Sequence, residues 1–363
     1  MPLKQRYDRV LMAATAVQTV LGLALVASAS WLIAEERYHR PGTWFVLWQA
    51  AAALAGLVAL VAAMHLRRRL LDDERIAWAV LGGVWVLLAA AFLGPAIAHT
   101  HRWVGFGPVS IQPSVLARVA IVLFAAVELP RAAREGWPTR RLLRFGGAVL
   151  LTALLIVLEP DLGSAVLLVA AATAMAWVAG LPLRHFAAPA VAGLAGLVAA
   201  IAAQPYRLAR IEAFLHPDVA SAAAWQTRQS LIALGSGGLL GRGYGAGLQK
   251  LFFLPEPHTD FILAIAGEEL GLLGVTFILL VAGIIVWRGL RIAARQTNPS
   301  HALLAFGLSF AFALQTLLHA AVCLGLAPPK GIPLPLISYG RTDLIVTLGT
   351  LGLLLNLGRE VDA

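Results

Sequence analysis

Residues 10–33 read VLMAATAVQTVLGLALVASASWLI, a stretch without a charged side chain. A helix of ~18 residues or more can cross the roughly 30 Å hydrocarbon core of a membrane. Similar blocks recur along the 363 residues, of which 60% are apolar and only 13% are charged. A soluble domain carries about 25% charged residues, and barrel strands would alternate polar with apolar side chains. The sequence therefore predicts an all-α, polytopic membrane protein.

Ten membrane-spanning helices are predicted, in a single membrane domain that covers residues 1–363. Their expected ranges are 10–33, 43–65, 76–98, 114–130, 145–158, 162–180, 186–204, 261–287, 302–326 and 337–358. The fifth and sixth are separated by Glu159-Pro160-Asp161-Leu162-Gly163, where proline and glycine favour a tight reversal over one long helix. We find no internal repeat and no second soluble domain.

The basic residues indicate which side of the membrane each loop faces. Segments 1–9, 66–75, 131–144, 181–185, 288–301 and 359–363 hold 17 Lys and Arg residues, against five in the short loops of the other side. Cytoplasmic loops carry the excess of Lys and Arg, so both termini are predicted to be cytoplasmic. This topology accounts for the net charge of +9, and no nucleic-acid partner is expected.

The longest connection, residues 205–260, is predicted to be a structured extracytoplasmic loop between the seventh and eighth spans. Its centre, Trp225 to Leu240, mixes apolar residues with Gln226, Arg228 and Gln229, which favours a helix lying in the membrane interface. Seven glycines then follow between residues 235 and 247. A connection of this length in a compact protein is usually functional.

Asp260 ends this loop, in the run Leu254-Pro255-Glu256-Pro257-His258-Thr259-Asp260-Phe261. It is predicted at the membrane–water boundary near a helix N-terminus, where the helix dipole favours an ionised carboxylate. One interpretation is a general base. The other is an ordinary helix cap, which Thr259 or Asp260 would make well.

Charged residues are also predicted inside the spans, where they seldom occur without a role. Arg118, Glu128, Glu268 and Glu269 are of this kind. Glu268 and Glu269 lie about 100° apart on a helix, so at least one is expected to face the bundle. Ion pairs that hold the fold are the structural alternative, including one between Arg118 and a carboxylate. Gln315 and His319 favour interhelical hydrogen bonds over a metal site.

The outer loops carry cations that could bind phosphate: Arg102, Arg207, Arg210, Arg228, Arg242 and Lys250. Guanidinium groups bind phosphate oxygens bidentately, and contact with anionic lipid headgroups is the alternative. The glycine run lacks the Gly-Lys-Ser/Thr of a P-loop, and no Cys/His cluster indicates zinc. These features suit an amphiphile with a pyrophosphate at the outer leaflet, and they leave reaction and transport both open.

Five motifs in order along nearly the whole chain resemble those of the SEDS family, the group that contains RodA, FtsW and SpoVE. They are Arg102-Trp103-Val104 with Gly107-Pro108 and Ile111-Gln112-Pro113-Ser114; Glu159-Pro160-Asp161-Leu162-Gly163-Ser164-Ala165; residues 229–238, from Gln229-Ser230 to Gly237-Gly238; Leu254 to Phe261; and Gly331-Ile332-Pro333-Leu334-Pro335-Leu336-Ile337-Ser338-Tyr339-Gly340.

The resemblance implies a peptidoglycan glycosyltransferase that polymerises lipid II at the outer face of the bacterial cytoplasmic membrane. In that family the aspartate matching Asp260 is essential, which implies that Asp260 takes the proton from the acceptor sugar 4-hydroxyl as this attacks C1 of the donor. Arg102, Arg207 and Arg210 are the candidates for stabilising the undecaprenyl pyrophosphate leaving group. A divalent cation such as Mg²⁺ could share that work. Further substrate-binding candidates are Trp103, Gln112, Glu159, Asp161, Gln229, Lys250, Glu256, His258 and Ser338.

Two positions depart from the family pattern. The glutamate expected after Ser114 is Val115, and Arg118 stands where a lysine is usual, so any ion pair between these positions is missing. The C-terminal signature normally continues Gly-Ser-Ser, and here it continues Arg341-Thr342-Asp343. This leaves Arg118 without its expected partner and makes a local Arg341–Asp343 contact possible.

The resemblance also implies partners. Family members act with a class B penicillin-binding protein, expected to make helix-to-helix contact in the bilayer, and with other proteins of the cell-wall synthesis complex. The short cytoplasmic ends favour a RodA-like role in elongation and cell shape over an FtsW-like role in division. A lipid II flippase, with its path lined by the intramembrane charges, and a non-catalytic scaffold are the alternatives. Alternating access usually goes with inverted repeats and broken helices.

Overall fold

The computed structural model describes residues 5–93, 102–106, 109–216 and 221–361. Its helices are α1 (Arg9–Glu36), α2 (Trp44–Met64), the 3₁₀ helix η1 (Arg68–Asp72), α3 (Glu74–Ala91), α4 (Pro113–Arg134), α5 (Thr139–Leu158), α6 (Leu162–Val178), α7 (Arg184–Ala202), α8 (Pro205–Leu215), α9 (Ala222–Ser236), α10 (Ile262–Arg295), α11 (Pro299–Cys323) and α12 (Arg341–Leu357). Two short antiparallel pairs join β1 (Gln5–Arg6) to β4 (Glu360–Val361) and β2 (Val104–Phe106) to β3 (Val109–Ile111). The predicted all-α class is confirmed.

Each expected span coincides with a helix, but several boundaries differ. Among the described residues, eight helices are long and apolar enough to cross a membrane, and α6 is a shorter apolar helix; the count of ten spans stays a prediction. α10 continues eight residues past the expected end, to Arg295, whereas α12 begins at Arg341. The backbone of Leu336 (φ 65°) and of Gly340 (φ 178°, ψ 92°) is not helical, so α12 begins only at Arg341. Residues 94–98 of the third expected span, and Gly107 and Pro108, lie outside the described residues.

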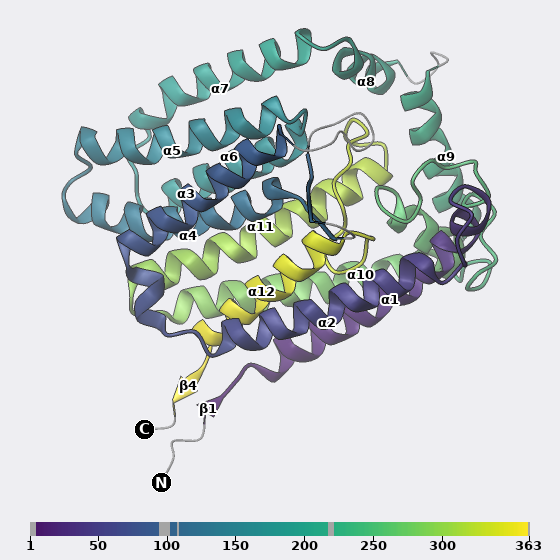
Figure 1. The fold of residues 1–363 in the computed structure, drawn as a ribbon, viewed down its shortest axis with the longest axis horizontal. Coiled ribbons are helices and arrows are strands. Elements are labelled where there is room, and N and C mark those ends of the chain that lie inside the picture. Colours follow the sequence, from purple (N-terminus) through teal and green to yellow (C-terminus); the bar gives the residue numbers. More distant parts are fainter. Residues whose placement is uncertain (1–4, 94–101, 107–108, 217–220, 362–363) are drawn as a thin grey trace.

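The long helices run side by side, and the two ends of the chain lie together at one end of the bundle (Figure 1). There β1 pairs with β4. The 205–260 segment, with α8 and α9, lies at the opposite end, and α9 crosses that end of the bundle (Figure 1). The termini and this loop therefore lie on opposite sides, as the predicted topology requires.

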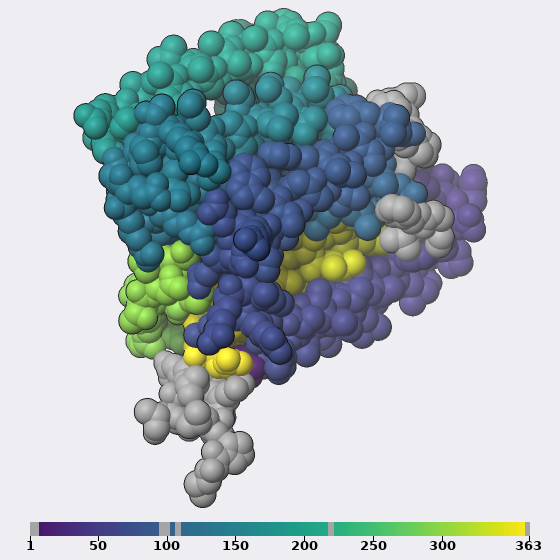
Figure 2. Space-filling view, turned by 60° about the vertical axis from the view of Figure 1, so that its left-hand side comes forward, coloured from purple at the N-terminus to yellow at the C-terminus, as the bar shows by residue number. Residues whose placement is uncertain are grey.

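Helix α4 lies at the centre of one half of the bundle. It packs against α3, α5, α6, α11 and α12, and small residues such as Ala117, Ala120 and Ala125 bring these neighbours close. Helix α7 is the contrast, since none of its residues is buried. Figure 2 shows part of α12, in yellow, uncovered between the N-terminal helices.

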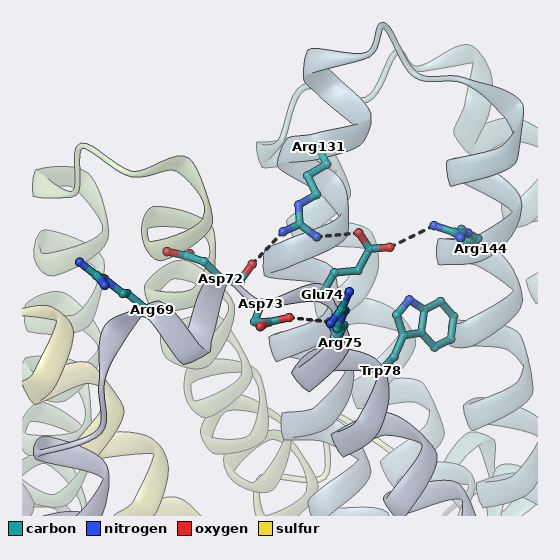
Figure 3. Close-up of a pocket in the computed structure, with 8 residues that line it drawn as sticks. All are labelled: Arg69, Asp72, Asp73, Glu74, Arg75, Trp78, Arg131 and Arg144. Carbon is teal, nitrogen blue, oxygen red and sulfur yellow. Dashed lines mark hydrogen bonds and ion pairs between the residues drawn. The ribbon is translucent and has the colours of Figure 1, made fainter.

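A cavity of about 560 Å³ at the end of the bundle where the termini lie, lined by η1 and the ends of α3, α4 and α5, holds a cluster of ion pairs (Figure 3). Glu74 binds both Arg131 (2.8 Å) and Arg144 (3.1 Å). Arg131 also donates to the carbonyl oxygen of Asp72 (2.8 Å). The cluster joins α3, α4 and α5 at the end where the termini lie. Arg131 and Arg144 are two of the basic residues that the sequence predicts on the inner side, and here both pair with Glu74.

Helix α10 is broken at Gly271, where φ is 68° and ψ is −169°. Backbone groups freed by such a break cannot find water within a membrane and need partners in the protein. Here the glycine-rich loop supplies them through four hydrogen bonds: Arg242 N–H to Glu268 O (3.0 Å), Gly243 N–H to Glu269 O (3.0 Å), Leu272 N–H to Gly238 O (2.9 Å) and Leu273 N–H to Leu239 O (3.2 Å). The glycine-rich loop thus completes the backbone hydrogen bonding of α10 on both sides of the break.

The same loop neutralises both intramembrane glutamates of α10. Glu268 accepts from the N–H groups of Leu248 (2.8 Å) and Gln249 (3.0 Å). Glu269 accepts from Ser28 (2.7 Å) and from Lys250 (2.5 Å). Both glutamates are therefore buried and paired, which is the structural alternative considered above.

Candidate functional site

Asp260 lies directly before α10, but neither it nor Thr259 caps the helix. The N-cap residue is Phe261, and no side chain makes a capping hydrogen bond. Thr259 instead donates to the carbonyl oxygen of Glu256 (3.2 Å). The capping interpretation is therefore wrong, because the chain enters the helix one residue later. The Asp260 carboxylate remains available for chemistry.

The surroundings of Asp260 raise the pKa of its carboxyl to about 7. Removal of water is the main cause, and the negative charge of Glu256 adds to it, whereas Arg210, Thr259 and Arg102 act in the opposite direction. The expectation that a helix dipole keeps this group fully ionised is wrong, because desolvation outweighs it. A carboxyl with a pKa near neutrality is well suited to proton transfer.

Four cations make up this cluster: Arg210 and Arg102 act electrostatically on the carboxyl, and Lys330 and Arg207 act on those two arginines. The structure ties three of the four to backbone carbonyls. Arg210 donates to Pro329 O (2.8 Å) and lies over the Tyr206 ring. Arg102 donates to Glu159 O (2.9 Å) and to Pro160 O. Arg207 donates to Ala200 O (2.8 Å) at the end of α7. None of these contacts is to a carboxylate, so the positive charges remain available to an anionic ligand.

Lys330 is the fourth cation, and it was not among the predicted site residues. Desolvation and the charge of Arg210 lower the pKa of its ammonium group, and Asp161 opposes that shift. It directly precedes Gly331, where an added Cβ would lie 3.2 Å from Asp260 Oδ2. A lone lysine at the start of the C-terminal motif was the signal that could have identified it.

The turn between α5 and α6 contributes two acids with different environments. Asp161 caps α6 by accepting from Ser164 N–H (3.2 Å), and it also accepts from Ser114 (2.9 Å) and Gln112 (3.3 Å). Glu159 is fully buried, and neither of its carboxyl oxygens has a hydrogen-bond partner among the described residues. Burial, with Asp161 adding to it, raises the pKa of Glu159 to about 8.

The C-terminal motif forms a wall behind Asp260. Ser338 donates from its hydroxyl to Thr259 O (2.6 Å), and Tyr339 N–H donates to His258 O (2.8 Å). His258 lies between the rings of Phe45 and Tyr339, and burial lowers its pKa to about 4. It is therefore neutral at physiological pH, and its role is packing.

The remaining predicted site residues are not all at this cluster. Glu256 forms an exposed ion pair with Arg37 (3.1 Å), Trp103 is half-buried before β2, and Gln229 is buried on α9. Lys250 is wrong as a substrate-binding cation, because its ammonium group donates to Glu269, Ser28 and Gly245 O and has no donor left.

The intramembrane charges form ion pairs within the protein, which is the structural alternative that the sequence left open, and Arg118 pairs with a carboxylate as that alternative expects. Arg118 pairs with Asp343 (2.9 Å), and Glu128 pairs with Arg141 (3.1 Å). Arg341 donates to Ser110 (3.0 Å) and lies over the Trp48 ring. The predicted interhelical hydrogen bonding is confirmed for Gln315, which binds Arg118 of α4 and Asp343 of α12. His319 instead contacts Ile332 O in the segment before α12.

Metal binding finds no support in the described ranges, which contain no group of three or more His, Cys, Asp or Glu side chains placed to hold an ion. The candidate site consists of the Asp260 carboxyl, the buried acid Glu159 and four cations at the end of the bundle away from the termini.

Comparison with known proteins assigns this arrangement to a family. The family model described as "Cell cycle protein" (FTSW_RODA_SPOVE) matches residues 8–363. The chain belongs to the FtsW/RodA/SpoVE family. The resemblance to the SEDS group is thereby confirmed.

Individual members of the FtsW/RodA/SpoVE family match this chain over almost their whole length. A probable peptidoglycan glycosyltransferase FtsW of Geobacter metallireducens is 36% identical over 98% of this chain and 96% of its own. A solved chain described under "Structural coordination of polymerization and crosslinking by a peptidoglycan synthase complex" superimposes with a TM-score of 0.78, at 27% identity and 97% coverage of both chains. The rod shape determining protein RodA of Thermus thermophilus gives a TM-score of 0.70 at 28% identity, over 97% of this chain and 96% of its own.

Proposed function

We propose that this chain is a peptidoglycan glycosyltransferase that polymerises lipid II at the outer face of the bacterial cytoplasmic membrane. The observation that carries the proposal is the Asp260 carboxyl, with a pKa of about 7, beside Arg210 and Arg102, whose guanidinium groups donate to backbone carbonyls among the described residues. The family relatives with that activity in their name support the same reaction. The function requires both termini to be cytoplasmic.

The proposed reaction assigns a step to each of these residues. Asp260 takes the proton from the acceptor sugar 4-hydroxyl, whose oxygen then bonds to C1 of the donor sugar. The bond between C1 and the pyrophosphate oxygen breaks, and the undecaprenyl pyrophosphate leaves with the electron pair. Arg102, Arg207, Arg210 and Lys330 stabilise the growing negative charge, which is the contribution expected of fixed cations at a leaving group.

A lipid II flippase is the second candidate, and the charge pairing argues against it. Arg118, Glu128, Glu268 and Glu269 would have to face a translocation path, yet each has a partner within the protein. Helix α10 is broken in the way transporters often show, but the break is filled by the loop's own backbone. These contacts favour a fixed structure over alternating access.

The proposed partner is a class B penicillin-binding protein, in keeping with the peptidoglycan synthase complex whose solved chain this protein resembles. The expectation of a RodA-like elongation role rested on short cytoplasmic ends. The relative at 36% identity carries the name FtsW, so we propose the division role over the elongation role. Rescue of division, and not of rod shape, in depleted cells would support that choice.

The proposed function is tested with purified protein, its cognate penicillin-binding protein and labelled lipid II. We expect glycan strands to form in detergent, where no bilayer separates two compartments and translocation has no meaning. A parallel assay in sealed vesicles measures lipid II crossing. Crossing without polymer in either assay would overturn the glycosyltransferase proposal in favour of transport.

The polymerisation rate is expected to depend on pH through Asp260. Its pKa of about 7 means that the base is protonated and inactive below neutrality, so the rate should rise about tenfold per pH unit below 7 and level off above it. His258, with a pKa of about 4, cannot cause this rise. Initial rates between pH 5.5 and 7.5 measure the effect. A rate that is flat across this range would contradict the assignment.

A further inference from the structure

We propose that the intramembrane Arg118–Asp343 pair is a positioning pair for the Asp260 site, acting through Gln315 and the segment Gly331–Leu336. The inference rests on the proposed function for its kinetic consequence. The pair itself is a structural feature of this chain, which combines an apolar residue at position 115 with an aspartate at position 343.

Three helices meet at the pair. Arg118 of α4 and Asp343 in the first turn of α12 are 2.9 Å apart, with side chains 11% and 7% exposed. Gln315 of α11 binds both: its Oε1 accepts from Arg118, and its Nε2 donates to Asp343 Oδ1 (3.2 Å). The orientation of the Gln315 amide is therefore fixed by a cation on one side and an anion on the other.

Gln315 transmits this position to the wall behind Asp260. Its Nε2 also donates to Pro333 O (2.8 Å), and His319, one turn further along α11, contacts Ile332 O through Nδ1 (2.8 Å). Two successive carbonyls of the segment are thus held by α11. The preceding residue, Gly331, lies against the Asp260 carboxylate, with room for a Cβ only at 3.2 Å from Oδ2. A shift of Gln315 therefore moves the wall that surrounds the base.

The carboxylate that pairs with Arg118 comes from α12 and not from α4, which connects the two departures from the family pattern. Val115 lies one turn before Arg118 on α4, and both line a cavity of about 40 Å³. Residues three apart on a helix are neighbours, so a glutamate at 115 could reach Arg118. With valine there, α4 supplies no carboxylate, and Asp343 of α12 supplies it instead. Arg118 Nε is buried in the same place without a hydrogen-bond partner among the described residues.

The test compares three variants in the polymerisation assay: Gln315→Met, Asp343→Ser, and Val115→Glu combined with Asp343→Ser. Gln315→Met leaves the two charges paired and removes every hydrogen bond of the Gln315 amide, to Arg118 and Asp343 as well as to Pro333 O. We expect it to lower kcat about 10- to 100-fold with KM changed less, since small misplacements of reacting groups have effects of this size. Asp343→Ser should do the same, and adding Val115→Glu should restore most of the loss.

Two outcomes would overturn the inference. One is a kcat, per folded protein, that Gln315→Met and Asp343→Ser both leave unchanged; the pair would then only stabilise the bundle. The other is hydrogen exchange of residues 331–339 that Gln315→Met leaves unchanged, because the proposal requires faster exchange there. The exchange measurement needs no enzyme activity, so it decides the inference even if the wild type makes no polymer, a result that would count against the proposed function alone. It also remains decisive if Asp343→Ser does not fold.

Discussion

Asp260→Asn is expected to lower the rate of glycan polymerisation by about 10²- to 10⁴-fold, the contribution typical of a general base. Asparagine has nearly the same shape and cannot accept the proton of the attacking hydroxyl. The measurement is the initial rate of strand formation from labelled lipid II, with the partner protein in excess. Binding of lipid II should be retained, because the cations that face the pyrophosphate are unchanged.

The stability of the variant separates catalysis from folding. Burial raises the pKa of Asp260 from 3.8 to about 7, so its ionisation lowers the stability of the folded protein as pH rises through 7. The neutral asparagine removes that cost, and the melting temperature at pH 8 should not fall. Glu212→Gln is the matched control, since Glu212 is an exposed carboxylate of the same loop. A variant of Asp260 that polymerises as fast as this control would refute the role of base.

Gly271→Val is expected to destabilise the protein by about 2–6 kcal/mol, the largest structural effect of a single substitution that we anticipate. A φ of 68° with ψ of −169° belongs to a region that essentially only glycine occupies, and strain there costs about 1–3 kcal/mol. A Cβ would also overlap the backbone of Gly241 and Leu239 in the glycine-rich loop, and overpacking adds about 1–3 kcal/mol. Thermal unfolding in one detergent measures the difference.

Gly283→Ala is the control for this substitution. Gly283 lies in the same helix, with open space around its Cβ position. Alanine there should be neutral or should stabilise by about 0.5–1 kcal/mol, as helix propensity predicts. Equal melting temperatures for Gly271→Val and the wild type would show that the break in α10 is not a fixed part of the structure.

The membrane helices were predictable because length and apolarity alone decide them. Residues 10–33 could form nothing but a buried or lipid-facing helix, and α1 covers that range. The places where prediction failed are those where tertiary contacts decide. The break at Gly271 lies in an apolar helical stretch, and only the loop around residue 241 makes it stable. Local sequence gives no sign of hydrogen bonds that come from thirty residues away.

The candidate site also combines residues that the sequence could identify with contacts that only the folded structure shows. Asp260 and the arginines could be identified from residue type and motif, because few charged residues occur at a membrane boundary. The residues with which the charged side chains pair could not be identified in this way. Arg118 and Asp343 are 225 positions apart, and Lys250 looked available for phosphate until its contact with Glu269 was seen. Burial of Asp260 also reversed the expected sign of its pKa shift, since a helix dipole is readable from sequence and desolvation is not.

The hydrogen bonding of the glycine-rich loop to the break in α10 has a consequence for biogenesis. The part of α10 before its break, Ile262–Leu270, carries two glutamates, and each would cost roughly 2.5–3.5 kcal/mol at the bilayer centre on insertion scales. Their neutralising groups lie in residues 245–250, which leave the ribosome earlier and, with the predicted topology, must first be translocated. We therefore expect Ile262–Leu270 to remain at the translocon until the glycine-rich loop has folded back onto it. The candidate site would thus be assembled at the same moment as α10 enters the lipid.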